Sequence, residues 1–100
     1  MRSPRMTFAD FVATLKLAEP PAALGPALRA LWFEAKGDWN AAHEIAQELE
    51  SPTGARIHAY LHRKQGDLSN ARHWYGEAKV EPARGSLEAE WEAIVKASLL

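Results

Sequence analysis

The stretch Ile57–Tyr75, IHAYLHRKQGDLSNARHWY, decides the fold of this chain. Apolar residues recur at helical spacing on both sides of its Gly66-Asp67 step. A glycine that closes one helix, followed by an aspartate that caps the next, is typical of a helix–turn–helix unit. The stretch also holds three of the four histidines, both tyrosines and one of the four tryptophans. It is therefore the first place to look for a functional site.

The chain contains a second copy of this pattern. Gly37-Asp38 precedes Gly66-Asp67 by 29 residues, and the same offset relates the apolar positions on either side of the turn. The aligned pairs are Leu28 with Ile57, Ala30 with Ala59, Leu31 with Tyr60, Trp32 with Leu61, and Ala42 with Ala71. A shared period together with shared turn chemistry indicates two tandem helical hairpins.

Gly66-Asp67, followed by Ala71, Tyr75 and Ala78, resembles a tetratricopeptide repeat, although the period is shorter than the family's. The resemblance covers residues 26–80 and implies two stacked hairpins whose concave side binds a peptide. It also implies that the flanking helices act as caps. The string IHAYLHRKQGD…NARHWY is similar, too, to a group of small helical bacterial proteins, and that likeness implies no activity.

Residues outside the hairpins predict one further helix at each end. Thr7 with Asp10 is a capping-box-like start for a helix over 7–18, which Pro20-Pro21 ends. Ser86 opens a last helix over 86–99. No segment shows the alternation of a strand. We expect an all-α fold of about six helices, forming one domain over residues 1–100.

Composition narrows the classes of protein. The chain is 47% hydrophobic and 25% charged, with a net charge of −1, which is typical of a soluble globular domain and lacks the basic excess of a nucleic-acid binder. The absence of cysteine excludes disulfides, thiolate metal sites and a cysteine nucleophile. No run of 18 apolar residues or signal peptide is present, so we expect a cytoplasmic protein that does not interact with membranes.

Charge is concentrated in two segments of opposite sign. Arg56–Arg72 carries four basic residues and one acid, whereas Glu34–Glu50 carries five acids and one lysine. The leading hypothesis is a non-enzymatic module that binds a protein or peptide through this basic, aromatic segment, because arginine forks suit carboxylates. The residues expected to bind are Arg56, His58, Tyr60, His62, Arg63, Asn70 and Trp74. This hypothesis predicts no catalytic residue, cofactor or metal ligand.

The alternative is a histidine-based pocket for a metal or other ligand, with catalysis as an extension. His58 and His62 are four residues apart, so both rings project from one side of a helix. A third ligand would come from His43, Glu44 or His73.

The internal repeat argues against that pocket, because His62 occupies the position of Phe33, and His58 that of Arg29. His62 then reads most simply as a buried packing ring.

Three other positions carry separate expectations. Asn70 matches Ala41 in the first unit, so its amide is expected to bond a nearby histidine. Leu68 is expected on the inner face of its helix. Trp91, on the last helix, is the best candidate for a self-association contact, and a homodimer would form through the terminal helices.

Overall fold

Six α-helices and one 3₁₀ turn make up residues 5–100, the part of the chain that the computed structural model describes. The elements are α1 (Phe8–Ala13), η1 (Thr14–Lys16), α2 (Pro26–Ala35), α3 (Trp39–Glu48), α4 (Pro52–Gln65), α5 (Leu68–Ala78) and α6 (Leu87–Ser98). No strand occurs in this range, which confirms the expected all-α fold of about six helices. Residues 1–4 of the predicted domain lie outside the described residues. None of the described helices has the length and apolarity needed to cross a bilayer.

Local capping explains where most helices begin. The Thr7 hydroxyl accepts from the Asp10 amide at 3.0 Å, and the Asp10 carboxylate accepts from the Thr7 amide at 2.9 Å. This capping box starts α1, but the helix tightens into η1 at Thr14 and ends earlier than residue 18. Proline occupies the first turn of both α2 and α4, where its missing N–H costs nothing.

The two Gly-Asp turns have nearly the same geometry. Gly37 and Gly66 adopt φ values of 87° and 89°, in the left-handed region that glycine enters at little cost. Asp38 and Asp67 then cap α3 and α5 by accepting backbone N–H bonds of 3.1 and 3.2 Å. In each turn the aspartate amide also donates a hydrogen bond to the carbonyl five residues earlier, at 2.9 Å in both cases. The resemblance to tetratricopeptide repeats remains a prediction.

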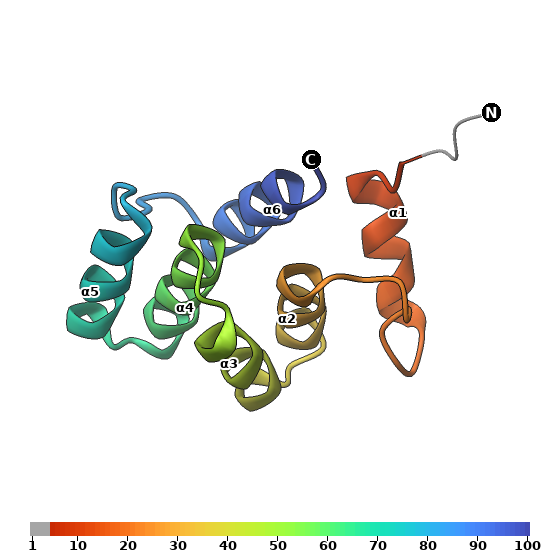
Figure 1. Ribbon diagram of the computed structural model, residues 1–100, viewed down its shortest axis with the longest axis horizontal. Coiled ribbons are helices and arrows are strands. Elements are labelled where there is room, and N and C mark those ends of the chain that lie inside the picture. The colour runs from red at the N-terminus through yellow and green to blue at the C-terminus, as the bar shows by residue number, and fades with distance from the viewer. Residues whose placement is uncertain (1–4) are drawn as a thin grey trace.

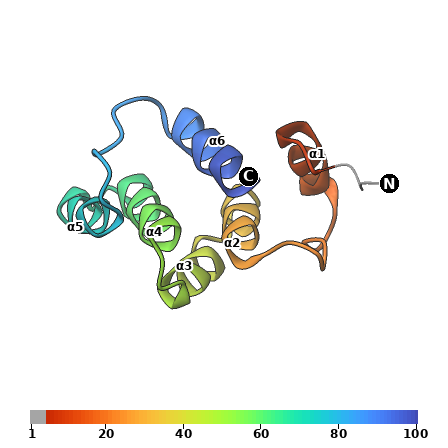
Figure 2. The same ribbon diagram turned by 45° about the horizontal axis from the view of Figure 1, so that its top comes forward.

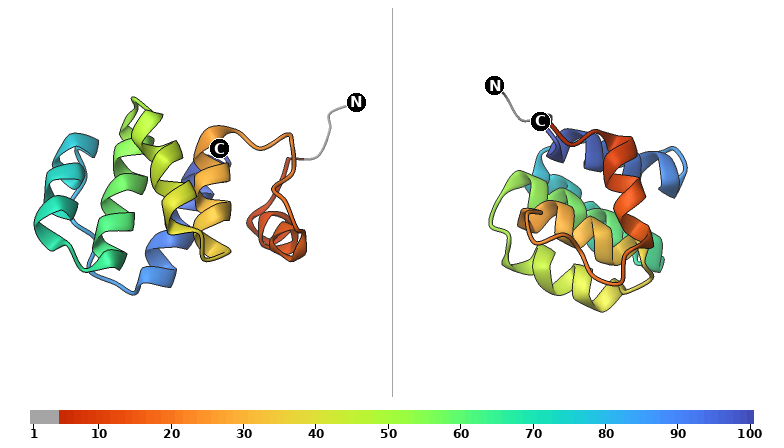
Figure 3. Two further views of the ribbon diagram at one scale, coloured as in Figure 1. Left: turned by 90° about the horizontal axis from the view of Figure 1, so that it is seen from below. Right: turned by 90° about the vertical axis from the view of Figure 1, so that its right-hand side faces the viewer.

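Four helices form a row, and the helices at the two ends of the chain pack against it and against each other. Figure 1 shows α5, α4, α3 and α2 along the long axis, with α1 beyond α2. α6 turns back and packs against α4 and α2, and α1 packs against α6 (Figures 2 and 3). α4 is therefore covered on several sides, by α3, α5, α2 and α6.

Burial follows from this arrangement. The main core joins α2, α4 and α6 around fully buried side chains, while a smaller cluster lies between α4 and α5 around Ala59, Ala71 and Tyr75. The largest fully buried side chains are Trp32, Phe11, Leu31, Ile57, Leu61, Ile94 and Val95.

One sequence expectation about burial needs correction. Leu68, the first residue of α5, is 57% exposed and does not lie on the inner face of the helix. Trp91 is half-buried, and its indole N–H donates to the Leu31 carbonyl at 3.1 Å. Its ring packs against Phe8 and Phe11, and self-association through Trp91 stays a prediction.

Candidate functional site

Three imidazoles converge between α3 and α4. His43 comes from α3, and His58 and His62 come from α4. One ring nitrogen from each of the three residues lies within 4.8 Å of the others. The Nε2 atoms of His43 and His58 are 2.9 Å apart. Three imidazole nitrogens at this spacing form a potential ligand set for one ion.

The geometry of the cluster follows from helical periodicity and from one helix crossing. His58 and His62 are one turn apart on α4, so their rings lie nearly parallel, with centroids 5.0 Å apart and 22° between planes. His43 approaches from α3 edge-on, with its centroid 4.5 Å from that of His58 and an angle of 88°. The perpendicular ring lets a nitrogen of His43 point at the α4 pair.

Two tryptophans enclose the cluster. Trp39 stacks on His43 with centroids 4.8 Å apart, and Trp74 stacks on His58 at 4.0 Å, with 10° and 11° between the planes. The Trp39 indole donates to the Leu61 carbonyl at 2.9 Å, which fixes that ring against α4. These indoles keep the imidazoles largely away from water, with His58 and His62 4% and 7% exposed.

Hydrogen bonds hold His62 in one tautomer. The Asn70 side-chain nitrogen lies 3.3 Å from His62 Nε2, and the Gln65 Oε1 lies 3.1 Å from His62 Nδ1. An amide NH₂ only donates and an amide oxygen only accepts, so Nδ1 carries the proton and Nε2 carries the lone pair. The contact between Asn70 and a histidine that the sequence predicted is therefore present.

His58 is left one partner short. Its Nε2 contacts His43, but its Nδ1 is buried and has no hydrogen-bond partner in the protein. A neutral imidazole needs one donor and one acceptor partner. A buried polar atom without a partner calls for an explanation, and a bound ion or molecule at the ring is one such explanation.

Burial favours the neutral form of His58 and His43. Burial, followed by the neighbouring imidazoles of His43 and His62, lowers the pKa of His58 to about 4. Burial and then His62 also lower the pKa of His43 from its ordinary value. A neutral imidazole has the lone pair that a metal ligand requires, whereas an imidazolium does not.

The other two candidates for a third ligand, Glu44 and His73, are exposed and lie outside the cluster. In α2, at the positions that the predicted repeat aligns with His58 and His62, the Arg29 guanidinium carbon lies 5.9 Å from the Phe33 ring centre.

The basic side chains that the sequence singled out are mostly engaged internally. Tyr60 is buried and its hydroxyl donates to Glu34 at 3.4 Å. Arg63 donates to Glu90 at 2.8 Å and also contacts the Gly85 carbonyl. Arg56 is half-buried. His58, His62, Asn70 and Trp74 therefore lie together at the imidazole cluster. Tyr60 and Arg63 lie elsewhere, beside Glu34 and Glu90.

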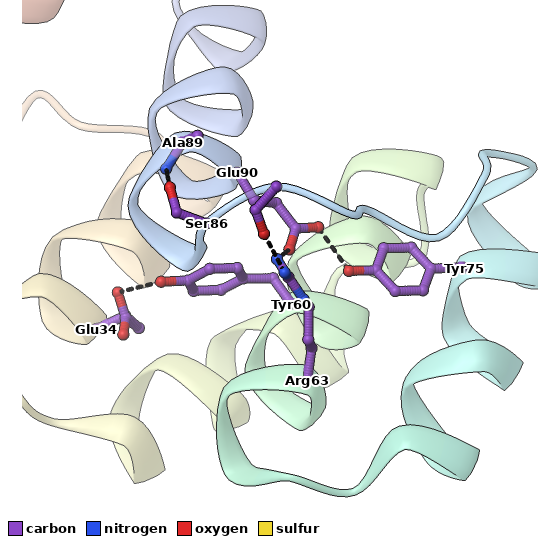
Figure 4. A network of polar contacts seen from close by, with 8 residues as sticks. Glu34, Tyr60, Arg63, Tyr75, Ser86, Ala89 and Glu90 are labelled. Carbon is purple, nitrogen blue, oxygen red and sulfur yellow. Dashed lines mark hydrogen bonds and ion pairs between the residues drawn. The ribbon is translucent and has the colours of Figure 1, made fainter.

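That second place contains two buried carboxylates, which the sequence analysis missed (Figure 4). Glu34 on α2 meets Tyr60 and Lys64, and Glu90 on α6 meets Arg63 and Tyr75. Burial, with the neighbouring carboxylates, raises the pKa of both tyrosines, so each phenol stays protonated and donates. In the sequence, the signal for these buried carboxylates was a glutamate at a helical position that faces the core.

Two surface cavities are lined by side chains that contact the imidazoles. One, of about 320 Å³, is lined by Trp39 and Gln65 together with Glu34 and Lys64, and another, of about 460 Å³, is lined by Trp74.

No protein-family model matches the chain, and comparison with curated proteins and with solved structures also gave no match. The function is therefore argued from the geometry of the chain's own residues.

Proposed function

We propose that this protein binds one divalent transition-metal ion through ring nitrogens of His43, His58 and His62. The observation that carries the proposal is the convergence of three imidazoles, one nitrogen each, within 4.8 Å. A chance pair of histidines on a helix would not bring a third ring from another helix to the same point.

The spacing is close to what an ion needs. Ligands about 2.0–2.1 Å from a tetrahedral zinc lie roughly 3.4 Å from one another. The His43–His58 nitrogens are slightly closer than this, at 2.9 Å, and the widest separation in the set is 4.8 Å. Binding of one ion would require ring rotation that brings the more distant nitrogens closer together.

The shell around the rings also suits an ion. Metal-bound histidines usually donate their second ring N–H to an oxygen, which fixes the tautomer. Gln65 accepts from Nδ1 of His62 in this manner, leaving Nε2 for a ligand bond once the Asn70 amide is displaced. With Nε2 of His58 as the ligand atom, its Nδ1–H has no acceptor within the protein.

The donor set defines the class of metal. Imidazole suits zinc, copper, nickel and iron, whereas calcium and magnesium prefer oxygen. Three histidines leave one position of a tetrahedral zinc open, which is the arrangement of catalytic zinc sites and of sites completed by a partner or substrate. The proposal is metal binding, and any hydrolytic activity would be an extension of it.

Cobalt(II) and zinc(II) titrations of chelator-treated, untagged protein test the proposal. We expect one ion per chain and a cobalt spectrum of low-coordinate nitrogen ligation. We also expect a melting temperature that rises with zinc concentration, because an ion that binds only the folded state stabilises it.

Two substitutions make the test specific. His43→Gln removes the least buried of the three ligands and is expected to weaken zinc binding at least 100-fold. His73→Gln changes an exposed histidine outside the cluster and is expected to leave binding unchanged. Equal uptake of zinc by wild type and His43→Gln would disprove the site.

Binding of a protein or peptide through the basic segment is a second, less supported prediction. Arg56 remains half-exposed and Arg72 exposed, and these two side chains are available to an acidic partner. Arg63 and Lys64 are paired with Glu90 and Glu34, so they contribute less free positive charge than the sequence suggested.

A further inference from the structure

A separate cavity lies on the opposite side of α4 from the imidazoles. Its volume is about 350 Å³, within the range of roughly 300–1,000 Å³ that small-molecule sites occupy. Three aromatic residues, Phe8, Tyr60 and Trp91, contribute to its walls from α1, α4 and α6. Tyr60 follows His58 by two residues, about 200° around the helix, so one helix serves both sites on opposite faces.

The cavity is negatively charged. Glu34, Glu88 and Glu92 line it, against the single cation Lys64. The Glu34 side chain is only 4% exposed, so its carboxylate faces the cavity in a poorly hydrated setting. A buried carboxylate is costly unless a cation or several donors compensate it.

Glu34 is held less firmly than the other buried glutamate. Glu90 accepts from Arg63 at 2.8 Å and from the Tyr75 hydroxyl at 2.7 Å, and the Arg63 side chain is itself only 18% exposed. Glu34 receives the Tyr60 hydroxyl at 3.4 Å and pairs with Lys64, whose side chain is 43% exposed. Figure 4 shows Tyr60 reaching Glu34 on one side and Glu90 held between Arg63 and Tyr75 on the other.

The ammonium of Lys64 is thus a replaceable partner. A lysine on a flexible, partly solvated stem returns to water at little cost, whereas an arginine fork that also contacts the Gly85 carbonyl does not. When Lys64 moves away, the Glu34 carboxylate is left facing a largely apolar cavity without a cation.

A lysine outside the cavity contacts two of the residues that line it. Lys96 pairs with Glu92 at 2.6 Å, and its Nζ lies 5.4 Å from the centre of the Phe8 ring. Carboxylates next to aromatic faces are the groups that bind organic cations, through ion pairing and cation–π attraction.

We propose that this cavity binds a small organic ammonium ion. The ammonium group takes the place of Lys64 on Glu34, and an apolar body packs against Phe8, Tyr60 and Trp91. The inference is independent of the metal site, because it uses none of the three histidines.

Phenethylammonium and 2-phenylethanol are matched probes, since they share size and ring and differ in charge. Each is titrated into ¹⁵N-labelled, chelator-treated protein while the indole N–H signal of Trp91 is followed. We expect saturable shifts with phenethylammonium and at least tenfold weaker binding of the alcohol.

Two substitutions with opposite effects sharpen the test. Glu34→Gln removes the negative charge that attracts the cation and is expected to weaken binding of phenethylammonium at least tenfold. Lys64→Gln removes the internal competitor while keeping a hydrogen-bond donor for Glu34, and it is expected to tighten binding severalfold. General damage to the cavity would weaken both variants, so the opposite signs are diagnostic.

Glu48→Gln on the exposed side of α3 is the control and should bind as wild type does. Equal binding of the alcohol and the ammonium ion would overturn the proposal, as would Lys64→Gln that binds no more tightly than wild type. If Glu34→Gln fails to fold, the binding of the two probes to wild type and to Lys64→Gln still tests the proposal. Zinc uptake tests the metal site separately.

Discussion

The indole of Trp74 lies flat on the imidazole of His58, with ring centroids 4.0 Å apart and 11° between their planes. Trp39 covers His43 in the same way from the other end of the cluster, at 4.8 Å. An ion held by the histidines would therefore lie near these two indoles. The other two tryptophans, Trp32 and Trp91, donate to the backbone of Thr14 and Leu31.

Copper(II) titration provides an optical test of this arrangement. Paramagnetic copper quenches indole fluorescence at short range, so we expect stoichiometric quenching in the wild type. Trp74→Phe should lose a large share of that quenching, because the indole nearest His58 is gone while the imidazoles remain. Trp91→Phe is the matched control and should keep it. Equal quenching in both variants would place the copper ion elsewhere.

The stability of the metal-free protein should fall in mild acid. The pKa of His58 is about 4 in the folded state, against about 6.5 in an unfolded chain. Below pH 6.5 the unfolded state binds a proton that the folded state does not, so the free energy of unfolding decreases as pH falls toward 4. The pKa of His43 is lowered too, which adds in the same direction.

The expected loss from His58 is up to about 3 kcal/mol between pH 6.5 and 4. Urea unfolding with a chelator at several pH values measures it. The charged or titratable groups facing His58 are His43, His62 and His73. His58→Gln should flatten the pH dependence over this window, whereas His73→Gln should not. A wild-type curve as flat as that of His58→Gln would contradict the prediction.

Glu90 is expected to be a main structural anchor of α6. Its carboxylate accepts from Arg63 on α4 and from Tyr75 on α5, so it joins three helices at one point. Glu90→Gln should cost about 2–4 kcal/mol of unfolding free energy, because it leaves a mostly buried guanidinium without its counter-charge. Glu88→Gln, an exposed neighbour on the same helix, should change stability by less than about 0.5 kcal/mol. Chemical denaturation of the pair decides this.

The sequence predicted the helices well because their signals are local. The Thr7 capping box and the Gly-Asp turns at Gly37 and Gly66 depend on residues within one turn of each other. Helix spacing also placed His58 and His62 on one face of α4. Such features survive in almost any tertiary arrangement.

The candidate site was only half visible in the sequence. His43 was one of three possible third ligands, and choosing it requires the crossing of α3 over α4, which no local pattern specifies. The role of Glu90 was missed for the same reason: its partners Arg63 and Tyr75 lie 27 and 15 residues away. Long-range pairing also explains why Arg63 looked like a free basic side chain.

Gly54 lies close to Leu49 in the loop between α3 and α4, and it carries the last prediction. A Cβ at Gly54, in the first turn of α4, would collide with the carbonyl oxygen of Leu49 and lie 2.5 Å from its Cβ. Because the obstacle includes backbone, Gly54→Ala should cost about 2–3 kcal/mol and disturb the approach of α3 to α4.

Gly76 in α5 is the matched control, since a Cβ there meets nothing within 4 Å. Gly76→Ala should stabilise the protein by about 0.5–1 kcal/mol through helix propensity. If His43 reaches the α4 imidazoles because of this close crossing, Gly54→Ala should also weaken zinc binding, whereas Gly76→Ala should not. Thermal unfolding and zinc titration of the two variants measure both effects, and equal stability of the two would contradict the steric argument.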